Sequence, residues 1–130
     1  MNASLKGFLS ENAAIGELVA RDFEVYKPIV DVYGCDLIIF KDNTYNKIQI
    51  KSAYVSNDAG MYTFSCRHGS YGNLQYEKGT IDFFMFHLVD INLWFIVPFD
   101  DISTTSACIT LNETNKYNKY RDAWHLLMEE

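Results

Sequence analysis

The hydrophobic and polar positions along the chain follow a helical period at the N-terminus and strand patterns after it. Over residues 5–23, LKGFLSENAAIGELVARDF, an advance of about 100° per residue gathers several apolar side chains on one side. These are Leu5, Phe8, Ile15, Leu18, Val19 and Phe23. The spacing predicts an amphipathic helix whose apolar side faces the core.

Further segments have the alternating or continuously apolar pattern of β-strands, separated by short polar turns. They are FEVYKPIV, CDLIIF, KIQIKSAYV, MYTFSCRH, TIDFFMFHLVD and LWFIVPFDDI, between residues 23 and 102. The last two are almost continuously apolar, which is typical of strands buried on both faces. Short turns, such as the one at Asp42 and Asn43, favour antiparallel neighbours.

The C-terminal segment NKYNKYRDAWHLLMEE, residues 115–130, predicts a closing helix with Trp124, Leu127 and Met128 turned inward. A helix, several strands and a terminal helix together predict an α/β fold, in which a mixed β-sheet is flanked by an N-terminal and a C-terminal helix. The chain has 130 residues and no internal repeat or linker composition, so we expect one domain spanning residues 1–130.

Composition and charge narrow the possible functions. The chain is 48% hydrophobic, yet no run reaches the length of a membrane span or has the form of a signal peptide, so we expect a soluble cytoplasmic protein. The net charge of −6 disfavours contact with a polyanion, but residues 41–78, with five basic and three acidic side chains, are net positive. The cysteines lack metal-ligand spacing and are expected to be small core residues.

Polar side chains interrupt two of the predicted strands. In KIQIKSA, the alternation of a strand places Gln49 and Lys51 on one face. The preceding strand begins with an isolated carboxylate, Asp36, and antiparallel pairing would bring the three side chains together. Each also has an ordinary explanation: Asp36 as the cap of a turn, Gln49 as a surface residue, and Lys51 with its ammonium extended to water.

The predicted N-terminal helix carries two glutamates that its periodicity separates. Glu17, with Arg21 one turn on, lies opposite Phe8 and is expected on the solvated side. Glu11 falls inside the apolar stripe, about 60° from Phe8, and is expected to face the sheet. A carboxylate there needs a cation or a donor, and a divalent metal would serve; the alternative is a position at the rim of the stripe.

The order of these residues resembles the PD-(D/E)xK nuclease superfamily: an Asp, then an acceptor and a Lys two positions apart on the next strand, with a Glu on the preceding helix. Within it, the chain is similar to the small homing endonucleases encoded in group I introns, of the kind found in cyanobacteria, along roughly residues 8–127. The segments that carry the likeness are FEVYKP, YGCDLIIF, IQIKSA, EKGTIDFFMFHL and LWFIVPFDDI. The resemblance implies a restriction-endonuclease-like core.

The resemblance also implies a role for each residue. Asp36, the Gln49 side-chain carbonyl and the Ile50 backbone carbonyl would hold Mg²⁺, or Mn²⁺ in its place. Glu11 would hold the ion through water or position a second ion, and Lys51 would contact the attacking water and stabilise developing charge. Gln49 departs from the family pattern, which has Asp or Glu there. Its carbonyl oxygen ligates a hard cation but brings no charge.

Double-stranded DNA is the expected partner. Side chains of the net-positive third are candidates for contacts with its backbone or bases, and a two-stranded ribbon over residues 47–68 is a candidate for entering the major groove. These side chains are Lys47, Arg67, His68 and Lys78. Ordinary solvated charge at strand ends explains them equally well. Because one active site cuts one strand, we expect a homodimer or homotetramer, joined through the apolar strands of the C-terminal half.

The predicted function is therefore that of a metal-dependent, site-specific DNA endonuclease of the intron-homing type. Two other functions stay open: a Holliday-junction resolvase or repair nuclease with the same core, and a catalytically inactive DNA-binding module, for which Gln49 is the argument. His87 and His125 stand apart from other ligand types and are expected to be structural.

Overall fold

The computed structural model describes residues 2–30, 34–56, 60–68, 74–102, 108–111 and 116–128. The α-helix in these ranges is α1 (Ala3–Ala20). The strands are β1 (Glu24–Tyr26), β2 (Leu37–Lys41), β3 (Thr44–Ala53), β4 (Tyr62–Ser65), β5 (Arg67–His68), β6 (Leu74–Gln75), β7 (Phe83–Leu88), β8 (Leu93–Pro98) and β9 (Cys108–Leu111). Short 3₁₀ helices are η1 (Val89–Ile91), η2 (Phe99–Asp101), η3 (Asn118–Tyr120) and η4 (Trp124–Met128).

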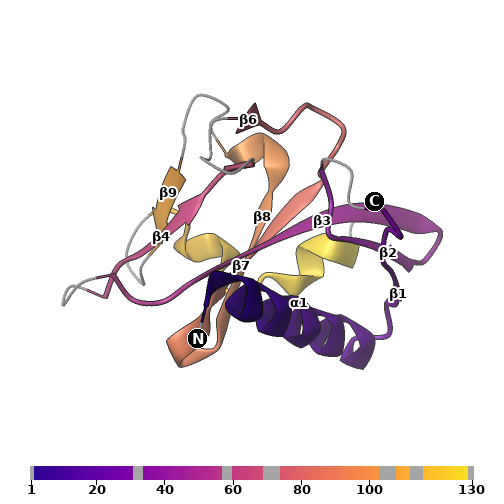
Figure 1. The fold of residues 1–130 in the computed structure, drawn as a ribbon. Coiled ribbons are helices and arrows are strands. Elements are labelled where there is room, and N and C mark those ends of the chain that lie inside the picture. The colour runs from indigo at the N-terminus through magenta and orange to yellow at the C-terminus, as the bar shows by residue number, and fades with distance from the viewer. Residues whose placement is uncertain are drawn as a thin grey trace.

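The main sheet is mixed, with the strand order β1-β2-β3-β7-β8 (Figure 1). β3 and β7 are parallel, whereas the other neighbours are antiparallel. Asp42 and Asn43 have φ values of 51° and 64° and form the tight turn between β2 and β3, as predicted. α1 packs on β1 and β3. The predicted α/β fold with a mixed sheet is confirmed.

β7 and β8 form the centre of the core, as their continuous apolar sequence predicts. On one face of β7, the Phe86 ring packs against Phe64 of β4, with ring centroids 4.8 Å apart. On the other face, His87 contacts Ser10 of α1 and stacks on Trp94, with ring centroids 4.0 Å apart. α1 therefore covers one face of the sheet, and β4 covers the other.

The helix α1 is rotated relative to the prediction. Its buried residues are Ser10, Ala14 and Leu18, whereas Leu5, Phe8 and Val19 of the predicted inward stripe are exposed. Small side chains at two of the three buried positions let the helix backbone approach the sheet closely, which larger side chains would prevent. The apolar stripe therefore correctly predicted a helix but not the side that it buries.

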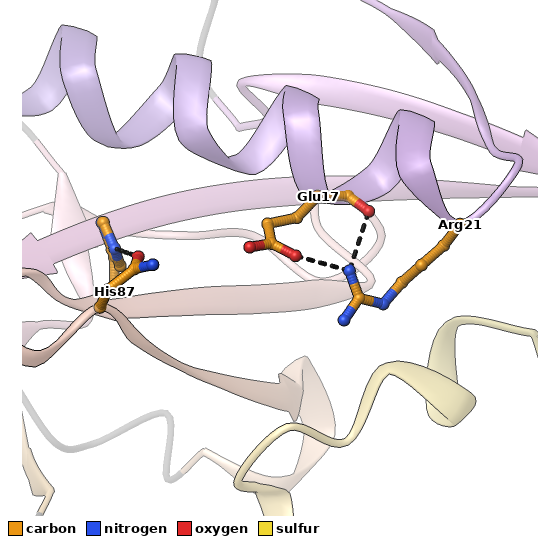
Figure 2. A network of polar contacts seen from close by, with 4 residues as sticks. Glu17, Arg21 and His87 are labelled. Atoms are coloured by element: carbon orange, nitrogen blue, oxygen red, sulfur yellow. Dashed lines mark hydrogen bonds and ion pairs between the residues drawn. The ribbon is translucent and has the colours of Figure 1, made fainter.

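The same rotation brings Glu17 to the flank of the buried side, so its predicted place on the solvated side is wrong. Figure 2 shows Glu17 and Arg21 on the side of α1 that faces the sheet. Arg21 Nη1 lies 2.6 Å from Glu17 Oε2, and the Arg21 guanidinium lies 4.0 Å from the centre of the Trp124 ring. The ion pair and the ring contact together compensate the partial burial of both charges.

The C-terminal segment forms η3 and η4 rather than the predicted single helix. Asp122, between them, has a φ of 50°, and its N–H donates to the Trp94 carbonyl at 2.9 Å. This bond ties the chain to the edge strand β8 and interrupts the helical period. Trp124 and Leu127 are buried as predicted, but Met128 is exposed.

Two predictions about the strands are wrong. One is a two-stranded ribbon over residues 47–68, and the other is an interface with a second copy through the apolar strands of the C-terminal half. β4 pairs with β9 in a separate small sheet, and β3 is hydrogen-bonded to β2 on one side and to β7 on the other, so within the described residues β3 and β4 do not pair as a two-stranded ribbon. The side chains of β7 and β8 are buried within the chain, which leaves them no apolar face for a second copy. Among the described helices, none is long and apolar enough to cross a membrane.

Candidate active site

A cavity of about 220 Å³ lies between α1, the segment after β1 and the segment before β2. Its lining residues are Glu11, Lys27, Pro28, Cys35 and Asp36. The two carboxylates predicted from the sequence therefore share one cavity. Cys35 is half-buried at this cavity rather than in the core, where it was expected; Cys66 is buried as predicted, and the Cys108 side chain lies outside the described part of the chain.

Glu11 reaches the cavity from the third turn of α1. The helix begins at its N-cap Asn2, whose Oδ1 accepts a hydrogen bond from the Leu5 N–H at 2.9 Å. Glu11 follows the buried Ser10 and has a side chain that is only 22% exposed. Its Oε1 lies 2.7 Å from Lys27 Nζ, and apart from Lys27 this buried atom has no hydrogen-bond donor among the described residues.

Two hydrogen bonds to the backbone of β3 hold Asp36 against this strand. Its N–H donates to the Ile48 carbonyl at 2.8 Å, and its Oδ2 accepts from the Ile50 N–H, also at 2.8 Å. These two partners are the neighbours of Gln49 in β3, so the carboxylate lies directly beside the strand position that carries the amide. Gly34 leads into this segment with a φ of 127°, a conformation that favours glycine.

Gln49 and Lys51 share the face of β3 whose partners on β7 are Phe84 and Phe86. Neither is among the residues that line the cavity. Lys51 is half-buried, its Nζ donates to the Arg67 carbonyl at 3.0 Å, and burial lowers its pKa although the nearby Asp36 charge raises it. Lys51 is thus a partly desolvated cation within electrostatic reach of the Asp36 carboxylate.

The donors at this position suit a hard divalent cation. Glu11 and Asp36 offer carboxylate oxygens to one cavity, and Gln49 and Ile50 would add carbonyl oxygens, which are the ligands that Mg²⁺ and Mn²⁺ prefer. The described residues contain no group of three or more His, Cys, Asp or Glu side chains arranged for a metal. Gln49 accounts for the missing third ligand of this kind, because it places an amide at the position where the superfamily has a further acidic residue. The buried Glu11 Oε1, which only an ammonium contacts, fits a site for a cation.

The residues predicted to contact DNA have different surroundings. Lys47 is half-buried and its ammonium donates to the Gly79 carbonyl, Arg67 is half-buried beside Lys51, and Lys78 is exposed. The His68 side chain lies outside the described part of the chain. Their role in binding DNA stays a prediction.

Lys27 is a functional candidate that the sequence analysis missed. It lies just beyond β1, and its contact with Glu11, through a hydrogen bond and through charge, raises the pKa of Lys27. A signal was present in FEVYKP: side chains two apart on a strand share a face, and Val25 of β1 packs against the core. Lys27 is therefore directed to the same side as Val25, toward α1.

A second polar network, around the buried His87, joins α1 to the turn between β7 and β8 (Figure 2). His87 Nδ1 lies 2.8 Å from Ser10 Oγ, and His87 Nε2 lies 2.9 Å from Asn92 Oδ1. Because Asn92 Oδ1 is only an acceptor, Nε2 carries the hydrogen, and Nδ1 accepts from the serine hydroxyl. Burial lowers the pKa of His87, against the opposing effects of Asn92 and of the Glu17 charge. Both ring nitrogens are satisfied and neither partner lines the cavity, as expected for a structural histidine.

Comparison with known proteins shows the family to which this architecture belongs. The sequence model of the PD-(D/E)XK endonuclease family matches residues 1–127 of the chain. The chain belongs to the PD-(D/E)XK endonuclease family. Among solved structures, this family member is similar to a bacterial homing endonuclease, I-Ssp6803I, with 27% sequence identity and a TM-score of 0.82 over 98% of this chain and 91% of that one. No curated protein matches the sequence. The restriction-endonuclease-like fold and the assignment to a nuclease family, both predicted from the sequence, are confirmed.

Proposed function

We propose that this PD-(D/E)XK endonuclease hydrolyses phosphodiester bonds at a specific site in double-stranded DNA, with Mg²⁺ or Mn²⁺ as its cation. One observation carries the proposal: Glu11 and Asp36 line the same cavity, and Asp36 is hydrogen-bonded to the residues on both sides of Gln49. The helix α1 and the segment before β2 thus bring two carboxylates to one cavity, and Asp36 lies beside the position of Gln49 in β3.

Each residue has a distinct role in this proposal. Asp36, Glu11 and the carbonyl oxygens of Gln49 and Ile50 hold the cation, which when bound polarises a phosphate oxygen and acidifies a water molecule. Lys51 stabilises the charge that develops on the phosphate. Its partial burial strengthens this effect, because a charge in a partly desolvated site interacts more strongly than one in water.

The finer assignment, to a homing endonuclease, is supported by the similarity to I-Ssp6803I over nearly the whole of both chains. A single nuclease domain over residues 1–130 and a cytoplasmic location are parts of the same proposal. Cleavage of linear duplex in preference to branched DNA is the result that would separate this function from that of a junction resolvase.

Cutting both strands of a duplex requires two active sites, so we further propose a homodimer or a homotetramer. The outward side of α1 is the surface that we assign to contact with a second copy. It exposes Leu5, Phe8, Leu9 and Val19 and carries no charged residue, so two negatively charged chains can meet there without opposing like charges. Light scattering of the Phe8→Glu variant should show smaller particles than the wild type, and a monomeric wild type would contradict the proposal.

The test of the enzymatic proposal is plasmid cleavage with Mg²⁺ and with a chelator. The Lys51→Met variant should lose about 100-fold or more of the cleavage rate, the size of loss typical of a preorganised electrostatic group. It should retain DNA binding. Lys119→Met, an exposed lysine in η3, is the matched control and should cleave like the wild type. Equal cleavage by the Lys51→Met variant and the wild type would contradict the assigned role.

The uncharged Gln49 favours one alternative, a DNA-binding module with an inactive nuclease site. The plasmid-cleavage assay distinguishes an active endonuclease from such a module. Binding of duplex by the wild type without any cation-dependent cleavage, under conditions in which the protein is folded, would favour the inactive module.

A further inference from the structure

Lys27 occupies the position at which a cation would be bound by Glu11. Its Nζ lies 2.7 Å from Glu11 Oε1, inside the cavity that Asp36 also lines. Apart from this ammonium, no donor among the described residues reaches that buried oxygen. In the free protein, therefore, the charge of Glu11 is balanced by Lys27.

The Lys27 ammonium at Glu11 Oε1 opposes the binding of a divalent cation by the same carboxylate, because the two positive charges repel each other at close range. The Lys27 ammonium can move away from Glu11 because its side chain is 61% exposed, whereas that of Glu11 is 22% exposed. The long, flexible side chain of lysine lets its ammonium move to water or to another anion while the backbone stays in place. A DNA phosphate at the mouth of the cavity is such an anion.

We propose that Lys27 is a positioning residue that holds Glu11 in the absence of metal and couples cation binding to DNA binding. The ammonium competes with the cation for Glu11, and a DNA phosphate withdraws it and frees the carboxylate. The inference rests on the proposed function, since it takes the cavity as a cation site beside DNA. Coupling is reciprocal, so bound cation raises the affinity for DNA by the same factor by which DNA raises the affinity for cation.

Calorimetric titration of the metal-free protein with Mn²⁺, without DNA, tests the competition. Lys27→Met removes the ammonium and keeps an unbranched side chain, and Lys27→Arg keeps the charge. We expect Lys27→Met to bind Mn²⁺ about three- to fivefold more tightly than the wild type, the upper part of the range for loss of one partly exposed ion pair. Lys27→Arg should stay within about twofold of the wild type. Lys119→Met, which changes the net charge equally, should bind like the wild type.

A double-mutant cycle with Glu11→Gln shows whether the effect passes through Glu11. In the Glu11→Gln background, Lys27→Met should no longer tighten Mn²⁺ binding. A second titration, with Ca²⁺ in the presence and absence of a short random-sequence duplex, measures the coupling. The duplex should raise the Ca²⁺ affinity of the wild type, and this factor should fall toward one in Lys27→Met. Thermal unfolding without cation verifies that each variant is folded.

Equal or weaker Mn²⁺ binding by Lys27→Met would overturn the inference, and so would equal tightening by Lys119→Met, which would show an effect of net charge alone. If the wild type binds Mn²⁺ and Lys27→Met binds it equally, only the role of Lys27 fails. If the folded wild type binds no divalent cation, both this inference and the proposed metal-dependent function fail.

Discussion

Replacing Asp36 separates its structural role from its chemical one. Its Oδ2 accepts from the partly buried Ile50 N–H at 2.8 Å, and a hydrogen bond to a charged group contributes about 1.5–3 kcal/mol to the free energy of unfolding. Asp36→Ala loses this bond and also the attraction between the carboxylate and the nearby ammoniums of Lys27 and Lys51. We expect a net destabilisation of about 1.5–3 kcal/mol.

Asp36→Asn keeps an oxygen that accepts from the Ile50 N–H and removes only the charge. We expect its free energy of unfolding to stay within about 1 kcal/mol of the wild type. Both variants should lose cation-dependent cleavage, because neither offers a carboxylate to the cation. Urea unfolding in the presence of a chelator, combined with plasmid cleavage in Mg²⁺, measures the two effects. Wild-type cleavage by Asp36→Asn would contradict the role of the carboxylate in cation binding, and equal destabilisation of the two variants would contradict the role of its hydrogen bond to Ile50.

Three further predictions concern the amide, the core histidine and a turn. Gln49→Glu restores a charge at the position of the family acid and should tighten Mn²⁺ binding about tenfold in calorimetry; unchanged affinity would place Gln49 outside the cation site. Because burial lowers the pKa of His87, the unfolded chain takes up a proton near pH 6.5 that the folded chain does not. The free energy of unfolding should therefore fall as the pH drops below about 6.5, by at most about 1.4 kcal/mol per unit from this group, and urea unfolding should show this slope in His125→Gln but not in His87→Phe. Gly34→Ala forces a side chain into a φ of 127° and should cost about 1–3 kcal/mol, whereas Gly16→Ala, in open space on α1, should stabilise by about 0.5–1 kcal/mol; equal melting temperatures of the two variants would contradict the strain.

The elements that the sequence predicted well are those with one strong local signal. β7 and β8 are long apolar runs, and the turn at Asp42 and Asn43 has residues that tolerate a positive φ. Asp36 is conspicuous because it is an isolated charge at the start of an apolar strand. Such features depend on a few neighbouring residues, so they can be recognised without knowledge of the tertiary contacts.

The orientation of α1 could not be read in the same way, because most of the helix is apolar or small. Packing decided it: Ser10 and Ala14 fit against the sheet, and Phe8 does not. Glu11 was correctly predicted to face inward because it flanks both the predicted and the observed buried side. Lys27 was missed because it belongs to the site only through its tertiary contact with Glu11 of α1.

The most direct measurement is the anomalous diffraction of a crystal soaked in Mn²⁺. We predict one strong peak in the cavity, within coordinating distance, about 2.0–2.3 Å, of carboxylate oxygens of Asp36 and Glu11 or of a water that they hold. We also expect Lys27 Nζ to have moved away from Glu11 Oε1. A peak bound elsewhere, with the cavity empty and the Lys27–Glu11 ion pair intact, would contradict the assignment of these residues to a metal-dependent nuclease site.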